Sequence, residues 1–271
     1  MRLHANSEAR MRTARLPSDL LRPRPNWCSG ALPEHSYGQA RFTSTAASVA
    51  SPAAMGRFID LSHQVVEGME TYRPLPTPRV EVINNYDASV YEGKSEFLIA
   101  SLHLCGNTGT YVDSPRHRFR AGVDLAGLPL ERLADLAVVV ADATGAGRAI
   151  GPNDLPSGDV RGKAVLVRTD FSRHWGTDNY FSGNPYLTAE ACEALIEAGA
   201  AFVGIDSLNI DDIDDKSRPA HTILLGAGVP ICEHMTNLAA VESDHGRLHA
   251  VPIAWVGGAT FPVRAYIVSA T

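Results

Sequence analysis

The segment GNTGTYVDSPRHRF, residues 106–119, contains side chains that can ligate ions or move protons, set among two glycines and a proline. Alternate residues of an extended strand share a face, so Asn107, Tyr111 and Asp113 would point the same way. Positions 107 and 111 would then lie ~13 Å apart at ~3.3 Å per residue, too far for one small ligand to touch both. The strand must therefore bend if these residues form one site.

Glycine and proline supply the bend and the stop. Gly109 is the position where a kink or bulge costs least, because glycine has no Cβ. Pro115 ends the strand, since it cannot donate to a β-ladder. His117 follows on the turn and can reach back toward Asp113. We therefore expect a curled strand end that gathers polar side chains at one point.

A second candidate pair is His221 and Glu233, which flank the apolar segment TILLGAGVPIC. Each residue has an ordinary structural explanation when taken alone, as a helix-capping histidine and as a surface glutamate. Two other features have simpler interpretations than chemistry. The acidic cluster at residues 211–215 lacks the Gly and Glu positions of a calcium loop, so we expect a solvated loop. Cys105 lacks an evident base partner, so we favour packing over nucleophilic catalysis.

Several apolar runs predict the strands that must position these groups. Residues 79–86 and 95–107 are typical of strands, and the continuous runs at 136–142, 163–170 and 201–206 predict strands buried on both faces. Residues 248–258 and 261–270 are expected to close the chain as strands. A short helix or turn is expected within 124–136.

Helices are fewer. Residues 188–200 predict a helix with Thr188 as N-cap, an acidic first turn and an end at Gly199. Residues 221–241 predict a helical turn, a Gly-Pro turn and a second helix. The elements together indicate an α/β domain with more strand than helix.

Composition limits the function classes. The chain has 271 residues and a net charge of −6, with no basic stripe, which argues against nucleic-acid binding. No run of ~18 apolar residues predicts a membrane span. Four cysteines without a C-x-x-C pattern, in a chain long enough to fold without disulfides, favour a reducing, cytoplasmic location.

Residues 1–55 differ from the rest, with seven Arg and three acidic residues, a net charge of +4. They show no apolar periodicity, so they bury too little surface to offset their ordering entropy. An Arg-rich, acid-poor segment also fits an organellar transit peptide. We favour a disordered or spurious extension, with Met55 as a possible true start.

The chain resembles the cyclase family that contains bacterial kynurenine formamidase. The family pattern H-x-G-T-H-x-D-x-P-x-H corresponds here to NTGTYVDSPRH, residues 107–117. Further matching stretches are IDLSHQVVEGMETY, TDFSRHWG, PYLTAEACEALIEAGAAFVGID, HTILLGAGVPICEHMTNL and FPVRAYIV. The resemblance implies one α/β domain over residues 56–271, with a mixed, barrel-like β-sheet flanked by helices.

The resemblance also implies a two-zinc site. One ion is bound by two motif histidines, the Asp and a Glu, and the other by the Asp, a later His and the Glu. In this chain Asp113, His221 and Glu233 remain as ligands of the second ion. The last motif histidine, His117, is implied as the general acid/base, and Tyr72 as a residue of the substrate pocket.

Both first motif histidines are replaced, by Asn107 and Tyr111. An amide oxygen suits harder cations and a neutral phenol is a poor ligand. His103 lies ~13 Å before Asn107 along a strand, so we do not expect it to compensate. We therefore expect one divalent cation, Zn²⁺ or Mn²⁺. Asn107 and Tyr111 either donate hydrogen bonds to a developing oxyanion or only fill the space of the lost metal.

These residues favour a metal-dependent hydrolase that acts on an amide, formamide or lactone bond, with N-formylkynurenine as the first substrate to test. One alternative is a single-metal or metal-free lyase or cyclase that uses Tyr111 and His117 as an acid/base pair. Another is a non-catalytic protein that binds a small molecule. The expected partners are a small-molecule substrate and further copies of the chain, without nucleic acid or membrane.

Overall fold

Three apolar runs of the sequence form the centre of the main sheet in this computed structural model, which describes residues 56–242 and 245–269. The strands β5 (Leu136–Asp142), β7 (Ala164–Arg168) and β9 (Phe202–Ile205) pair in parallel, as continuous apolar runs predict. Val138 and Leu166 belong to the hydrophobic cluster on one face, and Val139 belongs to the cluster on the other. The sheet is therefore buried on both sides.

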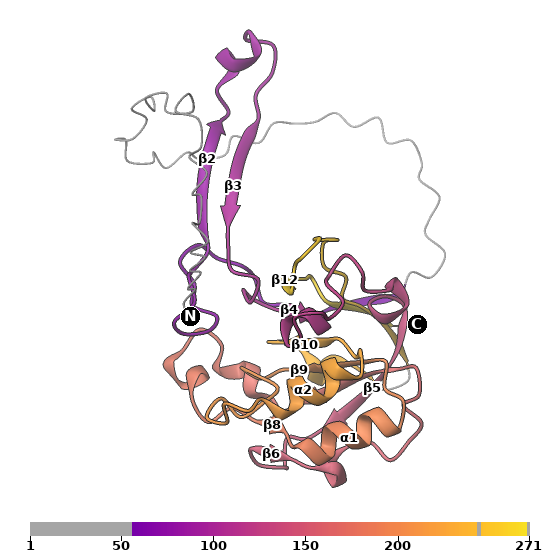
Figure 1. Cartoon of the computed structure of the whole chain (residues 1–271). Coiled ribbons are helices and arrows are strands. Elements are labelled where there is room, and N and C mark those ends of the chain that lie inside the picture. The colour runs from indigo at the N-terminus through magenta and orange to yellow at the C-terminus, as the bar shows by residue number, and fades with distance from the viewer. Residues whose placement is uncertain (1–55, 243–244, 270–271) are drawn as a thin grey trace, which may run out of the picture. The chain divides into compact units, whose positions relative to one another are not determined.

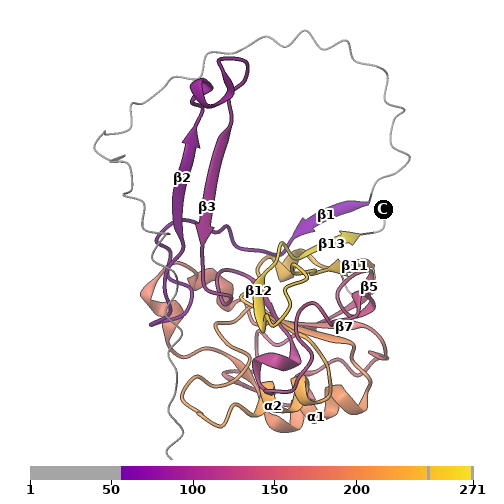
Figure 2. The same cartoon turned by 45° about the horizontal axis from the view of Figure 1, so that its top comes forward.

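Nine strands make this mixed sheet, and the chain order is not the spatial order. From edge to edge they are β1 (Arg57–Asp60), β13 (Tyr266–Ser269), β11 (Gly246–His249), β5, β7, β9, β10 (Ile231–Glu233), β4 (Tyr111–Asp113) and β12 (Thr260–Pro262). The strands at both ends pair antiparallel. Figures 1 and 2 show the sheet curling into a half-barrel, which confirms the expected α/β fold with a barrel-like mixed sheet.

Two helices cover one face of the sheet. The helix α1 (Ala189–Glu197) begins where Thr188 accepts a hydrogen bond from the N–H of Ala191, and Gly199 follows its end with a φ of 82°. The predicted cap and stop are thus confirmed. The helix α2 (Pro219–Gly226) packs beside it, and both place apolar side chains on the same cluster. Among the described residues no helix is long and apolar enough to cross a bilayer.

Smaller elements complete the chain. Two-stranded sheets are formed by β2 (Arg79–Asn85) with β3 (Leu98–His103), and by β6 (Ala149–Ile150) with β8 (Tyr186–Leu187). Short 3-10 segments are η2 (Ala88–Tyr91), η3 (Pro115–His117), η4 (Leu130–Arg132), η5 (Pro152–Asp154), η6 (Phe171–His174), η7 (Asp178–Phe181) and η8 (Leu238–Ala240). The turn expected within residues 124–136 is η4.

Two sequence-based predictions of elements are wrong. The second helix expected within residues 221–241 is only η8, because Asn237 adopts a left-handed φ of 57° and the segment is held by tertiary hydrogen bonds such as Thr236 N–H to Leu61 O. The strand expected over residues 248–258 ends at His249, because Pro252 and a turn at Trp255 interrupt the ladder. The interpretations of residues 1–55 concern a segment outside the described residues.

Candidate active site

The polar segment at residues 106–119 forms the bend that the sequence predicts. Gly109 has a φ of 64°, in the left-handed region, and only residues 111–113 form the strand β4. In the antiparallel pairing with β10, Tyr111 lies opposite Glu233 and Asp113 lies opposite Ile231. Because alternate residues share a face, Tyr111, Asp113 and Glu233 all point to the side covered by α2. The sheet register thereby brings together residues that are far apart in the sequence.

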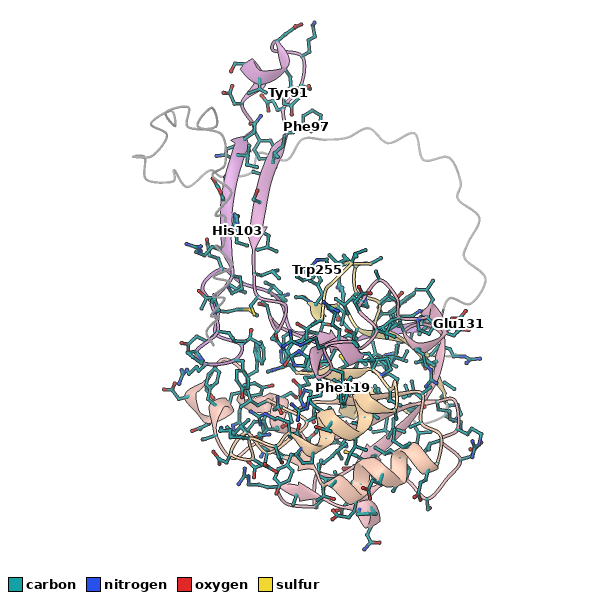
Figure 3. All side chains as sticks on the ribbon, viewed as in Figure 1. Tyr91, Phe97, His103, Phe119, Glu131 and Trp255 are labelled. Atoms are coloured by element: carbon teal, nitrogen blue, oxygen red, sulfur yellow. The ribbon has the colours of Figure 1, made fainter. Side chains whose placement is uncertain are left out.

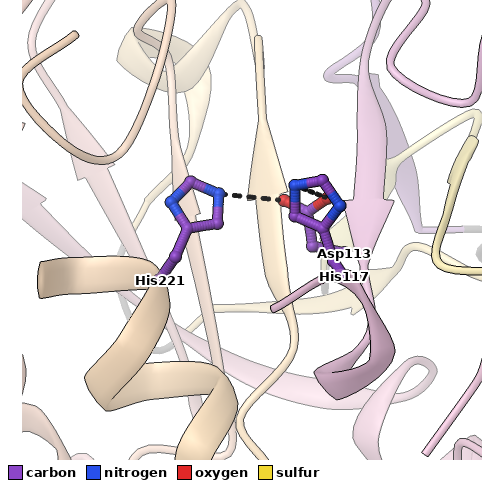
Figure 4. Close-up of side chains that lie close together, drawn as sticks. All are labelled: Asp113, His117 and His221. Atoms are coloured by element: carbon purple, nitrogen blue, oxygen red, sulfur yellow. Dashed lines mark ion pairs between the residues drawn. The ribbon is translucent and has the colours of Figure 1, made fainter. Parts of the chain in front are cut away.

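Asp113 is the centre of the cluster. Its side chain is 0% exposed, and neither carboxylate oxygen has a hydrogen-bond partner among the described residues. His221 Nε2 lies 3.7 Å from Oδ2 and His117 Nε2 lies 3.9 Å from Oδ1, too long for hydrogen bonds (Figure 4). A buried carboxylate without partners costs several kcal/mol unless a cation compensates it. Asp113, His117 and His221 each offer one ligand atom, all within 4.8 Å of one another, a fit for a divalent cation.

The orientation of His221 is fixed by a residue that sequence reasoning placed elsewhere. Asp211 is 0% exposed, so the expected solvated loop at 211–215 is wrong for this residue. Its Oδ2 lies 2.5 Å from His221 Nδ1, and its Oδ1 accepts a hydrogen bond from the N–H of Ala220 at 2.6 Å. Asp211 therefore satisfies the start of α2 and holds the imidazole so that Nε2 faces Asp113. The signal available in the sequence was an Asp shortly before a Pro-initiated helix.

The charges around His221 favour a cation at this position. Burial by itself would lower the pKa of His221, but the hydrogen bond to Asp211 and the negative charges of Glu233 and Asp113 outweigh it and raise the pKa to about 10. The same negative charges stabilise a proton or a metal ion on Nε2, so the two compete for this atom.

Glu233 is held by several donors. Its Oε1 accepts a hydrogen bond from the N–H of Ile210 at 2.7 Å and lies 3.6 Å from His221 Nε2. Its Oε2 accepts a short hydrogen bond from the hydroxyl of Tyr111 and a long one of 3.4 Å from Asn209 Nδ2. Burial raises the pKa of Glu233 above its usual range. The structure places the predicted ligand beside the cluster, and its role as a ligand stays a prediction.

Tyr111 is a neutral hydrogen-bond donor. Burial, with the nearby charges of Glu233 and Asp113, raises the pKa of its phenol well above the ordinary value. Its hydroxyl group is directed at Glu233, in the place where the family pattern has a histidine. Asn107 lies close by, where its Oδ1 accepts a hydrogen bond from Thr260 Oγ1 at 3.3 Å.

A cavity of about 340 Å³ opens onto these residues. Among the predicted site residues, Tyr72, Asn107, Tyr111, His117 and His221 line it. Its other lining residues, Leu75, Arg118, Asn209 and Arg218, were missed by sequence reasoning. In the sequence Arg118 directly follows His117, and Arg218 comes shortly before His221. Their closeness to predicted site residues was the signal available.

Two residues considered as alternatives lie outside the cluster. His103 ends β3, where its Nε2 lies 3.5 Å from Glu81 Oε2 in a solvent-exposed pair. Cys105 is a half-buried free thiol with no imidazole partner among the described residues.

The fold agrees with comparisons against known proteins. A family model named Cyclase, described as "Putative cyclase", matches residues 59–212. The chain belongs to the cyclase family. It is 31% identical over 188 residues to a kynurenine formamidase of Salinibacter ruber, covering 69% of this chain and 87% of that one. It is 29% identical over 215 residues to a kynurenine formamidase of Bacillus mycoides, covering 78% of this chain and 97% of that one.

Solved structures show the same fold. Isatin hydrolase A from Labrenzia aggregata, bound to benzyl benzoate, superposes with a TM-score of 0.66 at 23% identity, covering 79% of this chain and 94% of that chain. A predicted metal-dependent hydrolase from Bacillus stearothermophilus superposes with a TM-score of 0.62 at 26% identity, covering 79% of this chain and 98% of that chain.

Proposed function

We propose that this member of the cyclase family is a metal-dependent hydrolase that cleaves C–N bonds of amides, with N-formylkynurenine as the first candidate substrate. The observation that carries the proposal is the fully buried Asp113 carboxylate, which has no hydrogen-bond partner in the described part of the chain and faces two imidazoles. The names of the relatives support the reaction class, since they are kynurenine formamidases and isatin hydrolases. A lactone C–O bond is the runner-up target of the same chemistry.

We assign the cation to Asp113 and His221, with a third ligand supplied by His117 or Glu233. The donor set of carboxylate and imidazole suits Zn²⁺ and Mn²⁺. A bound divalent cation polarises a carbonyl group and lowers the pKa of a water molecule. Asp211 holds the His221 ring so that its Nε2 faces Asp113, where a cation would be held, and Glu233 Oε1 lies 3.6 Å from the same nitrogen.

The remaining groups bind and protonate the substrate. His117 lies at the pocket surface with 33% of its side chain exposed, so it can exchange protons with solvent and with a leaving amine. Asn107 and Tyr111 line the cavity and can donate hydrogen bonds to a developing oxyanion. Tyr72 lines the same cavity and offers an aromatic surface to the substrate.

The alternative of a lyase or cyclase that uses Tyr111 and His117 as an acid/base pair receives less support with Tyr111 as the base. The raised pKa of Tyr111 keeps the phenol protonated at neutral pH, and its hydroxyl group is engaged with Glu233. A non-catalytic binding protein would keep the cavity and lack turnover, so it is distinguished by the assay below.

The test combines elemental analysis with an amide panel. Full-length protein purified without chelator is expected to contain about one equivalent of divalent cation and to hydrolyse at least one of N-formylkynurenine, formanilide and isatin. The isosteric Asp113→Asn variant should lose the cation and at least about 100-fold in turnover. The control is Asp142→Asn, an exposed carboxylate paired with Arg168. Wild-type protein with less than about a tenth of an equivalent and no turnover would contradict the proposal.

We also propose that the chain works as a homo-oligomer, because the β2–β3 hairpin exposes one apolar face. Val80 lies opposite Leu102, and Val82 lies opposite Ala100. The other face carries Glu81 opposite Ser101. Both outer edges of this two-stranded sheet are unpaired in the described structure. Figure 3 shows the hairpin extending away from the main sheet, with Tyr91 and Phe97 near its tip.

The exposed area fits a second copy of this chain. Nine large apolar side chains between residues 80 and 102 are 40–64% exposed. Over both faces and the tip of the hairpin they present on the order of 700 Å² of surface, similar to the ~800 Å² that each partner buries in a stable interface. A second exposed apolar patch of the same chain contains Ile253 (56%), Trp255 (47%) and Val256 (82%). Because the chain carries both patches, a second copy supplies a complementary surface to each.

A further inference from the structure

The cavity has two arginines at its lining, and neither forms an ion pair with a carboxylate of the described residues. Arg118 donates from Nε to Thr222 Oγ1 at 2.9 Å and from Nη2 to the carbonyl oxygen of Ser217 at 3.1 Å. Arg218 donates from Nη1 to the carbonyl oxygen of Asp212 at 2.8 Å and from Nη2 to the hydroxyl group of Tyr72 at 3.2 Å. All these acceptors are neutral. Each guanidinium has five N–H donors, so both keep donors for a ligand.

In the acidic loop beside Arg218, the carboxylates of Asp211, Asp212 and Asp215 contact other groups. Asp211 binds His221 and the start of α2, Asp212 pairs with Arg148 at 3.0 Å, and Asp215 accepts hydrogen bonds from Ser217. None of the loop's carboxylate oxygens lies within ion-pair distance of the Arg118 or Arg218 guanidinium among the described residues. In a chain with a net charge of −6, this leaves two guanidinium groups at one cavity without a close ion pair among the described residues, although hydrogen bonding from Ser217 and the charge of Arg218 lower the pKa of the nearby Asp215.

The backbone positions Arg218 for this role. Arg218 precedes α2 with a φ of 52°, a left-handed conformation that costs on the order of 1 kcal/mol for a residue with a side chain. The hydrogen bonds to Asp212 O and the Tyr72 hydroxyl group hold the guanidinium against the aromatic side of the cavity. The same helix that presents His221 to Asp113 therefore starts with a cation that also lines the cavity.

We propose that Arg118 and Arg218 bind a carboxylate of the substrate, so that the enzyme prefers aromatic amides that carry an anionic group. The fork of a guanidinium matches a carboxylate in geometry as well as in charge. Tyr72 and Leu75 line the same cavity and contact the apolar part of such a substrate. This proposal rests on the proposed function, because it takes the bound molecule to be a substrate. Carboxylate binding itself can be measured without turnover.

The test compares matched acids and neutral analogues. For wild-type protein we expect kcat/KM for N-formylkynurenine to exceed that of its methyl ester by about 10- to 100-fold, the range of one hydrogen bond to a charged group. The preference should lie mainly in KM. In Arg218→Gln and in Arg118→Gln the ratio should fall toward one, because kcat/KM for the acid falls more than kcat/KM for the ester.

The control is Arg116→Gln, because Arg116 donates to the carbonyl oxygens of Gly257 and Arg120 and does not line the cavity. Thermal unfolding of each variant shows whether it is folded, and two separate arginines keep the test valid if one variant fails to fold. Equal selectivity for acid and ester in wild-type protein would overturn the proposal, even if both are hydrolysed.

A binding experiment separates this proposal from the hydrolase assignment. Calorimetric titration with kynurenine and with its methyl ester should show at least about tenfold tighter binding of the acid, lost in the arginine variants. This result without any amide turnover would support carboxylate binding and contradict the hydrolase. Formate is titrated as well. If formate binding depends on both arginines while kynurenine and its ester bind equally, the pair holds the released acid, and the proposal is wrong.

Discussion

Asp211 Oδ2 lies 2.5 Å from His221 Nδ1, and the same carboxylate caps the first turn of α2. One buried side chain thus sets both the helix start and the direction of the imidazole. His221 is 5% exposed and faces Asp113 across 3.7 Å, so a rotation of its ring would remove one half of the candidate cation site. Asp211 is a positioning residue, since it acts on the site through His221.

We expect Asp211→Asn to weaken cation binding by about 10- to 100-fold, the usual effect of losing an outer-shell carboxylate. The Asn side chain can still accept from Ala220, but its NH2 group would face the two His221 donors that Oδ2 now accepts, so the loss of stability should be about 1–3 kcal/mol. Competition titrations with a chelator measure the affinity for Zn²⁺, and the control is Asp215→Asn in the same loop. Unchanged affinity would show that Asp113 and His117 orient His221 without Asp211.

The third cation ligand is decided by two variants. His117 lies at the cavity surface, whereas Glu233 already accepts hydrogen bonds from Ile210 and Tyr111. If His117 acts only as acid/base, His117→Gln keeps its cation and loses turnover by about 100-fold or more. If it is a ligand, the cation is lost, and Glu233→Gln keeps it instead. Elemental analysis of both variants, beside Asp113→Asn, separates the two assignments.

We expect Tyr111→Phe to destabilise the protein by about 1–3 kcal/mol, because the change leaves a buried carboxylate oxygen with only a long hydrogen bond to Asn209. The loss of this donor also raises the pKa of Glu233 further, since hydrogen bonding from Tyr111 lowers it. Urea unfolding measures the change. Tyr180→Phe, which removes a buried hydroxyl bound to His234 Nδ1 at 2.9 Å, is the matched control. A Tyr111→Phe variant with wild-type stability and turnover would show that the tyrosine only fills space.

Local sequence rules predicted the elements that depend on nearby residues. The cap at Thr188, the stop at Gly199 and the kink at Gly109 follow from backbone chemistry within a few residues. The contact between Tyr111 and Glu233 joins positions 122 residues apart and depends on the register of β4 and β10. No local pattern contains that register, and only the family resemblance placed Glu233 near Asp113.

The same limit explains the residues that were missed. An acidic run is usually solvated, and only the docking of α2 makes Asp211 a buried cap. From the sequence alone, Arg118 and Arg218 are indistinguishable from surface cations. The fold places both at the lining of one cavity. The helix wrongly expected after Glu233 failed because apolar composition does not distinguish a helix from a loop held by tertiary hydrogen bonds.

A charge introduced on the apolar face of the β2–β3 hairpin is expected to change the molecular mass of the protein in solution. We expect Leu102→Glu on its apolar face to convert the oligomer to monomer or to weaken association by at least about tenfold, because a charge would be buried against a second copy. The matched control is Ser101→Glu, the neighbouring residue on the polar face. Light scattering during size-exclusion chromatography gives the mass. A wild-type protein that stays monomeric at high concentration would contradict the assembly proposed for this face.

The lowered pKa of His63 is expected to make the free energy of unfolding depend on pH. Its ring stacks on Trp175 with centroids 3.9 Å apart, and burial lowers its pKa from 6.5 to about 4. Below pH 6.5 the unfolded chain takes up a proton that the folded protein refuses until about pH 4, so acidification through this window favours unfolding. The loss is about 2 to 3 kcal/mol and levels off below pH 4.

The variant His63→Phe keeps the stack and removes the titration, so its stability should fall less than that of wild type between pH 6.5 and 4.5. Urea unfolding across this range measures the difference, with His249→Phe, another imidazole stacked on an aromatic ring, as the control. Parallel curves for wild type and His63→Phe would show that His63 is protonated in the folded protein at the same pH as in the unfolded chain.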